Sequence, residues 1–566
     1  MIFNYNYSAL LLATILASLG IASSPILFVN PVYSQETESI IPETRSGAIA
    51  PLLNNLGDYQ FPISTNNILT QHFFNQGMIL AYGFNHAEAA RSFREAARHD
   101  STCAMCYWGL AYSLGPNINA AMEADDVPTA YDAIQQAIAL KDYATEREQA
   151  YIEAMADRYV AAPVDDRSEL DLAYTDAMRA VAQRYPDDAD AQTLFAEALM
   201  DTMPWDYWTD EGDAKPDTIE VLSTLESTIE KYPNHLGALH FYIHAVEKER
   251  PELGVEAADR LGDLAPGAGH LVHMPSHIYI RVGRYHDAVV ANQEAAAADQ
   301  AYVTQCHAQG IYPAAYMPHN HHFLNFAAIM AGQKEVAMES AYQTSQMADQ
   351  DLMRQVGYGT LQHYYMIPLY TMVQFDLWDE ILADPAPATD LVYPTGVWHY
   401  ARGMAFAANG QVNQAQQEWT ALTAIARSPD LDGVTIWDIN TTANLLDIAS
   451  NVLAGEIAAS QGDYDQAIAY FQRGVELEDR LNYDEPAAWS SPVRQNLGAV
   501  LLKAGRPAEA EQAYRENLAV YANNGWALYG LAHSLRAQGR DGEAEMVQRQ
   551  FEDAWQYADI TLVATQ

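Results

Sequence analysis

The chain has 566 residues, 49% of them hydrophobic, so it can bury a large core and is not disordered by composition. Asp and Glu outnumber Lys and Arg by 74 to 30, for a formal net charge of -44. A surface of this charge repels phosphate backbones, so we expect no nucleic-acid partner. It attracts cations, or it simply keeps the protein soluble in salty surroundings.

The N-terminus has the pattern of an export signal. Residues 8–29 are apolar or small and uncharged, and "VYSQ" follows, with Val32 and Ser34 suiting a signal-peptidase site. No Lys or Arg precedes the apolar run, and an uncleaved anchor of about 20 residues is the alternative. We predict a signal peptide over 1–34, a linker over 35–69, and a periplasmic or secreted mature protein with no membrane contact.

From residue 70 onward the hydrophobic periodicity is helical, and one pattern recurs. It appears in "FFNQGMILAYGFNHAEAARSFREAARHD", in "NLGAVLLKAGRPAEAEQAYRENLAVY" and in "GWALYGLAHSLRAQGRDGEAEMVQRQFEDA". Each segment combines a small residue in a first helix, a turn, and Ala in a second helix. This pattern resembles the tetratricopeptide-repeat family, with its 34-residue unit, and the chain looks like an exported bacterial-type member.

The resemblance implies an all-α fold, a right-handed superhelical solenoid of helix-turn-helix repeats over 70–566, with the best matches at about 448–558. It also implies a concave groove, lined by the first helix of each unit, in which this family binds a protein or peptide partner. The predicted units begin at Thr70, Ala104, Met155, Ala189, Leu236, Gly269, Pro318, Gln362, Gly396, Ile448, Ser491 and Gly525.

Cys103 and Cys106 form a C-x-x-C without the following His of a haem attachment site. A disulfide or a packed pair is one interpretation, and a soft copper site completed by Met78 and Met105 is the other. The remaining cysteine, Cys306, is typical of a small buried hydrophobe.

The insertion "MPWDYWTDEG" follows the predicted unit that begins at Ala189. Its aromatic residues Trp205, Tyr207 and Trp208 form either a rigid lid over the groove or an apolar cluster on the edge of the solenoid.

Histidines concentrate between about 235 and 322, in consecutive predicted units. Most take the second, fifth or ninth position of their unit, and these positions form one helical stripe that is turned away from the packing positions. In "HLGALHFYIHAVE", His240 and His244 have the i, i+4 spacing of a chelating pair, and Glu247 extends the same face. The stripe therefore predicts a metal site in the groove.

The predicted ligands are His240, His244, Glu247, His270, His273, His277, His319 and His322, with Glu197 as a further candidate. Imidazole and carboxylate ligands suit one or two transition metal ions, with Zn, Cu or Fe as the first candidates. Because only neutral imidazole ligates, we expect metal affinity to fall below a pH of about 6.5. The alternative is that these histidines are polar residues lining a peptide groove.

Pro275 complicates the helical spacing, because it removes an amide donor from the middle of its predicted helix. A helix that begins near Met274 would leave His270 and His273 in an entering loop. Pro368 has the same position in its own unit.

No serine or cysteine triad, H-E-x-x-H motif or phosphate-binding loop is present, so we favour a binding protein over an enzyme. The preferred function is an exported repeat protein that binds a transition metal ion in its groove for handling or storage. The alternatives are a metal-free scaffold for a protein partner, and a metal-dependent enzyme of unknown substrate in which Glu247 or Glu197 is the base.

Overall fold

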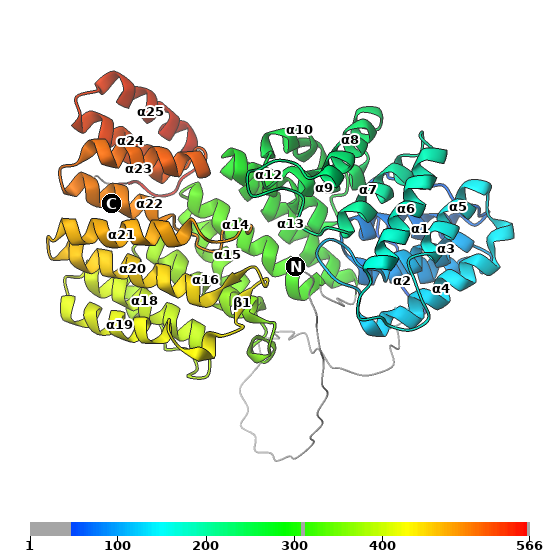
Figure 1. Cartoon of the computed structure of the whole chain (residues 1–566), viewed down its shortest axis with the longest axis horizontal. Coiled ribbons are helices and arrows are strands. Elements are labelled where there is room, and N and C mark those ends of the chain that lie inside the picture. Colours follow the sequence, from blue (N-terminus) through cyan, green and yellow to red (C-terminus); the bar gives the residue numbers. More distant parts are fainter. Residues whose placement is uncertain (1–46, 307–311, 563–566) are drawn as a thin grey trace, which may run out of the picture.

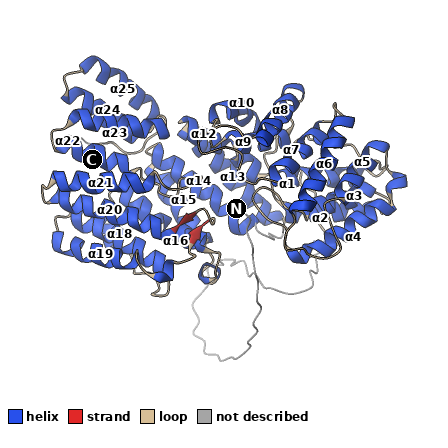
Figure 2. Cartoon of the chain, in the orientation of Figure 1, coloured by secondary structure: helices blue, strands red, loops and turns tan. Residues whose placement is uncertain are grey.

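The computed structural model describes residues 47–306 and 312–562, so the predicted signal peptide lies outside the described residues. The described chain is helical almost throughout, with one two-stranded antiparallel sheet, β1 (Thr435–Ile436) and β2 (Asn440–Thr441) (Figure 2). No helix in these ranges is long and apolar enough to cross a membrane.

The helices of the first half are α1 (Ile68–Tyr82), α2 (His86–His99), α3 (Ala104–Ser113), α4 (Val127–Ala139), α5 (Glu146–Ala156), α6 (Ser168–Arg184), α7 (Ala189–Asp201), α8 (Pro216–Lys231), α9 (Leu236–Val246), α10 (Pro251–Leu261), α11 (Gly269–His273), α12 (Pro275–Val282) and α13 (Tyr285–Gln305). Those of the second half are α14 (Met317–Met330), α15 (Lys334–Met347), α16 (Gly359–Gln374), α17 (Trp378–Ala383), α18 (Val392–Ala408), α19 (Val412–Ile425), α20 (Thr442–Ser460), α21 (Tyr464–Glu478), α22 (Val493–Lys503), α23 (Pro507–Val520), α24 (Gly525–Ala537) and α25 (Asp541–Ala554).

Helices that follow one another in the chain pack as hairpins, and the first helices of successive hairpins also pack together, as α18 does on α20 and α22 on α24. The recurring small residues explain this stacking. A Cβ atom on Gly77 of α1 or Gly109 of α3 would lie 2.6 or 2.4 Å from the ring of Phe93, which α2 inserts between them. Tyr514 occupies the same place between Gly498 and Gly530. The predicted all-α helical solenoid is confirmed.

Most predicted unit starts coincide with first helices, but the one at Met155 is wrong. Met155 lies at the end of α5, because a capping box between Thr145 and Glu148 starts that helix nine residues earlier, at Glu146. Residues 47–67, expected as a linker, run along α1 and bury Phe61 completely.

Pro275 divides one predicted helix into α11 and α12, as the missing amide suggested. His270 and His273 lie in the short helix α11 rather than in a loop, and the break falls at Met274. By contrast, α16 continues through Pro368 without interruption.

The array curls so that distant units meet (Figure 1). Near the N-terminus, α1 packs against α9. At the other end, the indole N–H of Trp526 in α24 donates to the carbonyl of Ile329 in α14 at 2.9 Å. The turn at Gly283 approaches the carbonyl of Ala522, where an added Cβ would lie 2.3 Å away. Elements from both ends of the chain therefore reach the middle units, where the histidines lie.

Candidate metal centre

The middle units bring a cluster of histidines together. Helix α9 supplies His240 and His244, and α11, α12 and α14 supply the others. Within the described residues, three groups have ligand atoms that all lie within 4.8 Å of one another: His240, His244 and His270; His273, His277 and His319; and Glu247, His277 and Glu485. We call the first two groups triad 1 and triad 2.

In triad 1 the ring nitrogens that face inward are unsatisfied. The Nε2 atoms of His240 and His244 and both ring nitrogens of His270 are buried and have no hydrogen-bond partner among the described residues. The three rings lie 4.8 to 6.2 Å apart, centroid to centroid. Buried polar atoms are usually paired, so this convergence of free lone pairs indicates a missing ligand.

In triad 2 the Nε2 atoms of His273 and His277 lie 2.9 Å apart, across the break between α11 and α12. Two nitrogens bound to one ion at about 2.0–2.1 Å and at a right angle have nearly this separation. His319 completes the triad from α14, and its buried Nδ1 has no partner in the described chain. The helix break therefore leaves His273 and His277 convergent, even though it ends their regular helical spacing.

In four of these histidines, Nδ1 contacts a polar group outside the cluster, which leaves Nε2 directed toward the other imidazoles. His240 donates to the carbonyl of Tyr82 at 2.6 Å, because a carbonyl oxygen only accepts. His273 donates to Oδ1 of Asn292 at 2.6 Å, and the amide nitrogen of Asn292 is committed to the carbonyl of Ala288.

The other two histidines, His244 and His277, are held by carboxylates. His244 Nδ1 lies 3.3 Å from Glu247 Oε1, and His277 Nδ1 lies 2.9 Å from Glu247 Oε2 and 2.7 Å from Glu485 Oε2. Partners of this kind fix the tautomer and aim Nε2 at the metal in metalloproteins. Glu247, which the sequence suggested as a ligand, thus lies behind the imidazoles of both triads.

Glu485 was not among the sequence candidates. It lies in the loop between α21 and α22, 208 residues from His277. No spacing pattern connects residues this far apart in the chain. Only the closure of the array brings that loop to α12.

The buried imidazoles are held in the neutral form that a metal requires. Burial, reinforced by the neighbouring histidines, keeps the pKa of His240, His270, His273 and His319 well below the usual value. Burial also lowers the pKa of His244, although Glu247 opposes this effect.

His277 is the exception. Burial alone would lower its pKa, but Glu247 and Glu485 outweigh this and raise the pKa to about 10. Burial likewise opposes ionisation of Glu247, yet His277 and His244 bring its pKa down to about 2. In the metal-free protein a proton therefore supplies the positive charge between these carboxylates.

The sequence suggested that the cluster lines an open groove, and the structure contradicts this. The five histidines of α9, α11 and α12 are at most 4% exposed. The ring of Phe84, in the turn after α1, lies 4.6 Å from the ring of His240 and 5.3 Å from that of His270, centroid to centroid. The ring of Phe323 lies 4.4 Å from that of His277 by the same measure. Aromatic side chains from the turn after α1 and from α14 thus cover the groove at this point.

The insertion before α8 contributes to the cover. The ring of Trp205 packs on that of His244 with 5.4 Å between the ring centroids, and the Trp205 side chain remains 41% exposed. Tyr207 and Trp208 are buried, and the Trp208 indole N–H donates to the carbonyl of Ala245 at the end of α9. Of the three aromatic residues, Trp205 therefore lies between the cluster and solvent.

Two predicted candidates lie apart from the triads. The ring of His322 faces His363 at 5.6 Å, in contact with α16. Glu197 accepts a hydrogen bond from the Tyr112 hydroxyl at 2.6 Å, and burial raises its pKa to about 7.

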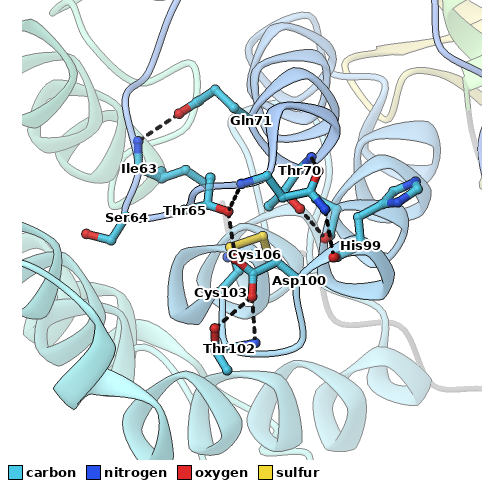
Figure 3. Close-up of a disulfide and its surroundings, with 12 residues drawn as sticks. Ile63, Ser64, Thr65, Thr70, Gln71, His99, Asp100, Thr102, Cys103 and Cys106 are labelled. Atoms are coloured by element: carbon cyan, nitrogen blue, oxygen red, sulfur yellow. Dashed lines mark hydrogen bonds between the residues drawn. A yellow bond between two sulfur atoms is a disulfide. The ribbon is translucent and has the colours of Figure 1, made fainter.

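The sulfur atoms of Cys103 and Cys106 are joined in a buried disulfide at the start of α3 (Figure 3). The Cys106 amide N–H points to Cys103 Sγ at 3.1 Å, and Thr65 donates to Asp100 beside it at 2.6 Å. Because the sulfurs are bonded to each other, they do not form the soft copper site considered from the sequence.

Fold and site together define a helical-repeat protein with a buried histidine cluster. The tetratricopeptide-repeat family model matches residues 446–523, so the resemblance inferred from the sequence is confirmed there and this segment consists of tetratricopeptide repeats. No curated protein matches the chain. Among solved structures, the chain is similar to human IFIT1, described as a dimer with m7Gppp-AAAA, at 11% identity over 87% of this chain and 91% of that one. The TM-score is 0.28, so this likeness carries no argument about function.

Proposed function

We propose that this protein is a tetratricopeptide-repeat scaffold that binds transition metal in the histidine cluster of its middle units. The observation that carries the proposal is the set of buried ring nitrogens in triad 1 that have no partner within the described chain. Leaving a buried polar atom unsatisfied costs about 1–3 kcal/mol, and an ion bound by all three rings would remove that cost.

The ligand chemistry narrows the choice of ion. Neutral imidazoles favour copper, zinc or iron over magnesium or calcium, which prefer oxygen ligands. Among divalent ions copper has the highest intrinsic affinity for a nitrogen site. The burial of the cluster supports retention of the ion, as in handling or storage, because exchange requires the cover around Phe84 and Trp205 to open.

A protein partner is the second candidate, and it concerns the C-terminal repeats. The tetratricopeptide match at 446–523 lies outside triads 1 and 2, and this family binds protein partners in its groove. A partner that leaves the contact between Glu485 and His277 in place is compatible with a metal in the cluster.

Metal analysis of protein purified without a His tag tests the proposal, after zinc, copper and iron are each offered and loosely held ions are removed by a weak chelator. We expect stoichiometric metal in the wild type and loss of the ion held by triad 1 in the double variant His240→Ala/His244→Ala. The His533→Ala variant is the matched control, because His533 lies at the same repeat position on α24, far along the chain. A wild-type protein that retains none of the three metals contradicts the proposal.

We also propose that the mature protein is exported. The apolar segment at 8–29 supports this, and so does the disulfide between Cys103 and Cys106, since disulfides persist mainly in oxidising compartments.

A further inference from the structure

We propose that the cluster is a dinuclear centre, in which triads 1 and 2 each bind one ion and a small anion bridges the two. This inference rests on the proposed function and adds to it the number of ions and the class of ligand that they bind together.

The two triads share no ligand. Triad 1 uses His240, His244 and His270, and triad 2 uses His273, His277 and His319. Three imidazoles suffice for a site that keeps one position open, as in catalytic zinc sites. A second ion therefore binds without taking a ligand from the first.

The two triads also lie close together. Helix α11 contributes His270 to triad 1 and His273 to triad 2, and the centroids of these rings lie 5.8 Å apart. On the other side, His244 and His277 lie 5.6 Å apart. Rings this close accommodate two ions at the roughly 3.5–4 Å separation of two-metal sites.

Glu247 contacts a histidine of each triad. Among the described residues, His244 Nδ1 contacts the carboxylate of Glu247 alone, whereas His277 Nδ1 contacts both Glu247 and Glu485. Glu247 thus orients one ligand of each ion, and a single carboxylate behind two sites fixes them relative to each other.

The class of ligand follows from charge and space. Two divalent ions bring four positive charges, and Glu247 and Glu485 supply two negative ones, with Arg281 a further cation 3.9 Å from Glu485. The remaining positive charge in a buried site calls for an anion. Because Phe84 and Phe323 pack directly on the rings, only a small one fits, such as hydroxide or azide.

The test uses copper(II) as the metal and azide as the anion, with the full-length protein. We expect two coppers per chain in the wild type, one in His270→Ala and one in His319→Ala, which remove one ligand from each triad. Azide titration should give one azide per pair of coppers. Spin coupling through the bridge should make the electron paramagnetic resonance intensity per copper far lower in the wild type than in either variant.

The outcomes separate this inference from the proposed function. A wild type that binds one copper overturns the dinuclear centre but leaves metal binding intact, and a wild type that binds none overturns both. Two coppers with full, uncoupled spin intensity, or with one azide each, contradict the bridge. Should a variant fail to fold by circular dichroism, the wild-type copper count and spin intensity still decide the question.

Discussion

Replacing Glu247 with Gln distinguishes a carboxylate that orients histidines from one that ligates metal. Glu247 is fully buried and contacts His244 Nδ1 at 3.3 Å and His277 Nδ1 at 2.9 Å. Glutamine keeps the shape of the side chain but offers only one oxygen acceptor. It therefore satisfies one imidazole and presents an N–H group to the other.

The two histidines should respond differently. His277 keeps its contact with Glu485 at 2.7 Å, whereas His244 contacts no second carboxylate in the described chain. Losing an outer partner lowers metal affinity about 10–100-fold, which corresponds to about 1.4–2.7 kcal/mol. We expect Glu247→Gln to weaken triad 1 by this amount and triad 2 by only a few-fold, with the metal stoichiometry unchanged. Glu485→Gln should weaken triad 2 instead.

Competition titrations against a chelator of known affinity measure both sites. Glu252→Gln, on the exposed face of α10, is the control and should leave both affinities unchanged. Complete loss of one metal equivalent in Glu247→Gln would show that Glu247 is a direct ligand. Unchanged affinities would show that the carboxylate does not orient the imidazoles, and either result refutes the reasoning.

Three further predictions concern stability and processing. Burial lowers the pKa of His363 to about 3 in the folded protein, whereas in the unfolded chain the pKa is about 6.5. Between these two values the unfolded chain binds the proton and the folded protein does not, so the free energy of unfolding should fall as the pH drops from about 6.5 toward 3. Urea denaturation should show a weaker pH dependence in His363→Gln, and an unchanged slope would contradict this. Reducing the disulfide between Cys103 and Cys106 should destabilise the fold by roughly 2 kcal/mol, since the closed loop is short; equal melting temperatures with and without reductant would argue against it. N-terminal sequencing of the mature protein should begin at Gln35, whereas an intact Met1 on membrane-bound protein would reverse the export proposal.

The sequence predicts the fold well because the repeat pattern is local. The contact of Phe93 with Gly77 and Gly109 follows from residues within one repeat length. The error at Met155 arose where that pattern is weak and a capping box sets the helix start.

The site was harder to predict, because its environment is made by segments far apart in the chain. Helical spacing brings His240 and His244 to one face, and that much is legible in the sequence. The cover by Phe84 and the arrival of Glu485 depend on how the array curls, which no local pattern encodes. The sequence therefore suggested an open groove where the structure has a buried centre.

The number of acidic side chains makes surface metal binding the main competing explanation for any metal found in this protein. X-ray absorption spectroscopy of the copper-loaded, untagged protein tests the central claim most directly, because it reports the atoms bound to the ion. The account predicts a first shell dominated by nitrogen at about 2.0 Å, with the outer-shell scattering of imidazole rings. A first shell of oxygen alone, as carboxylates on the acidic surface would give, or a sulfur ligand at about 2.3 Å, would contradict it.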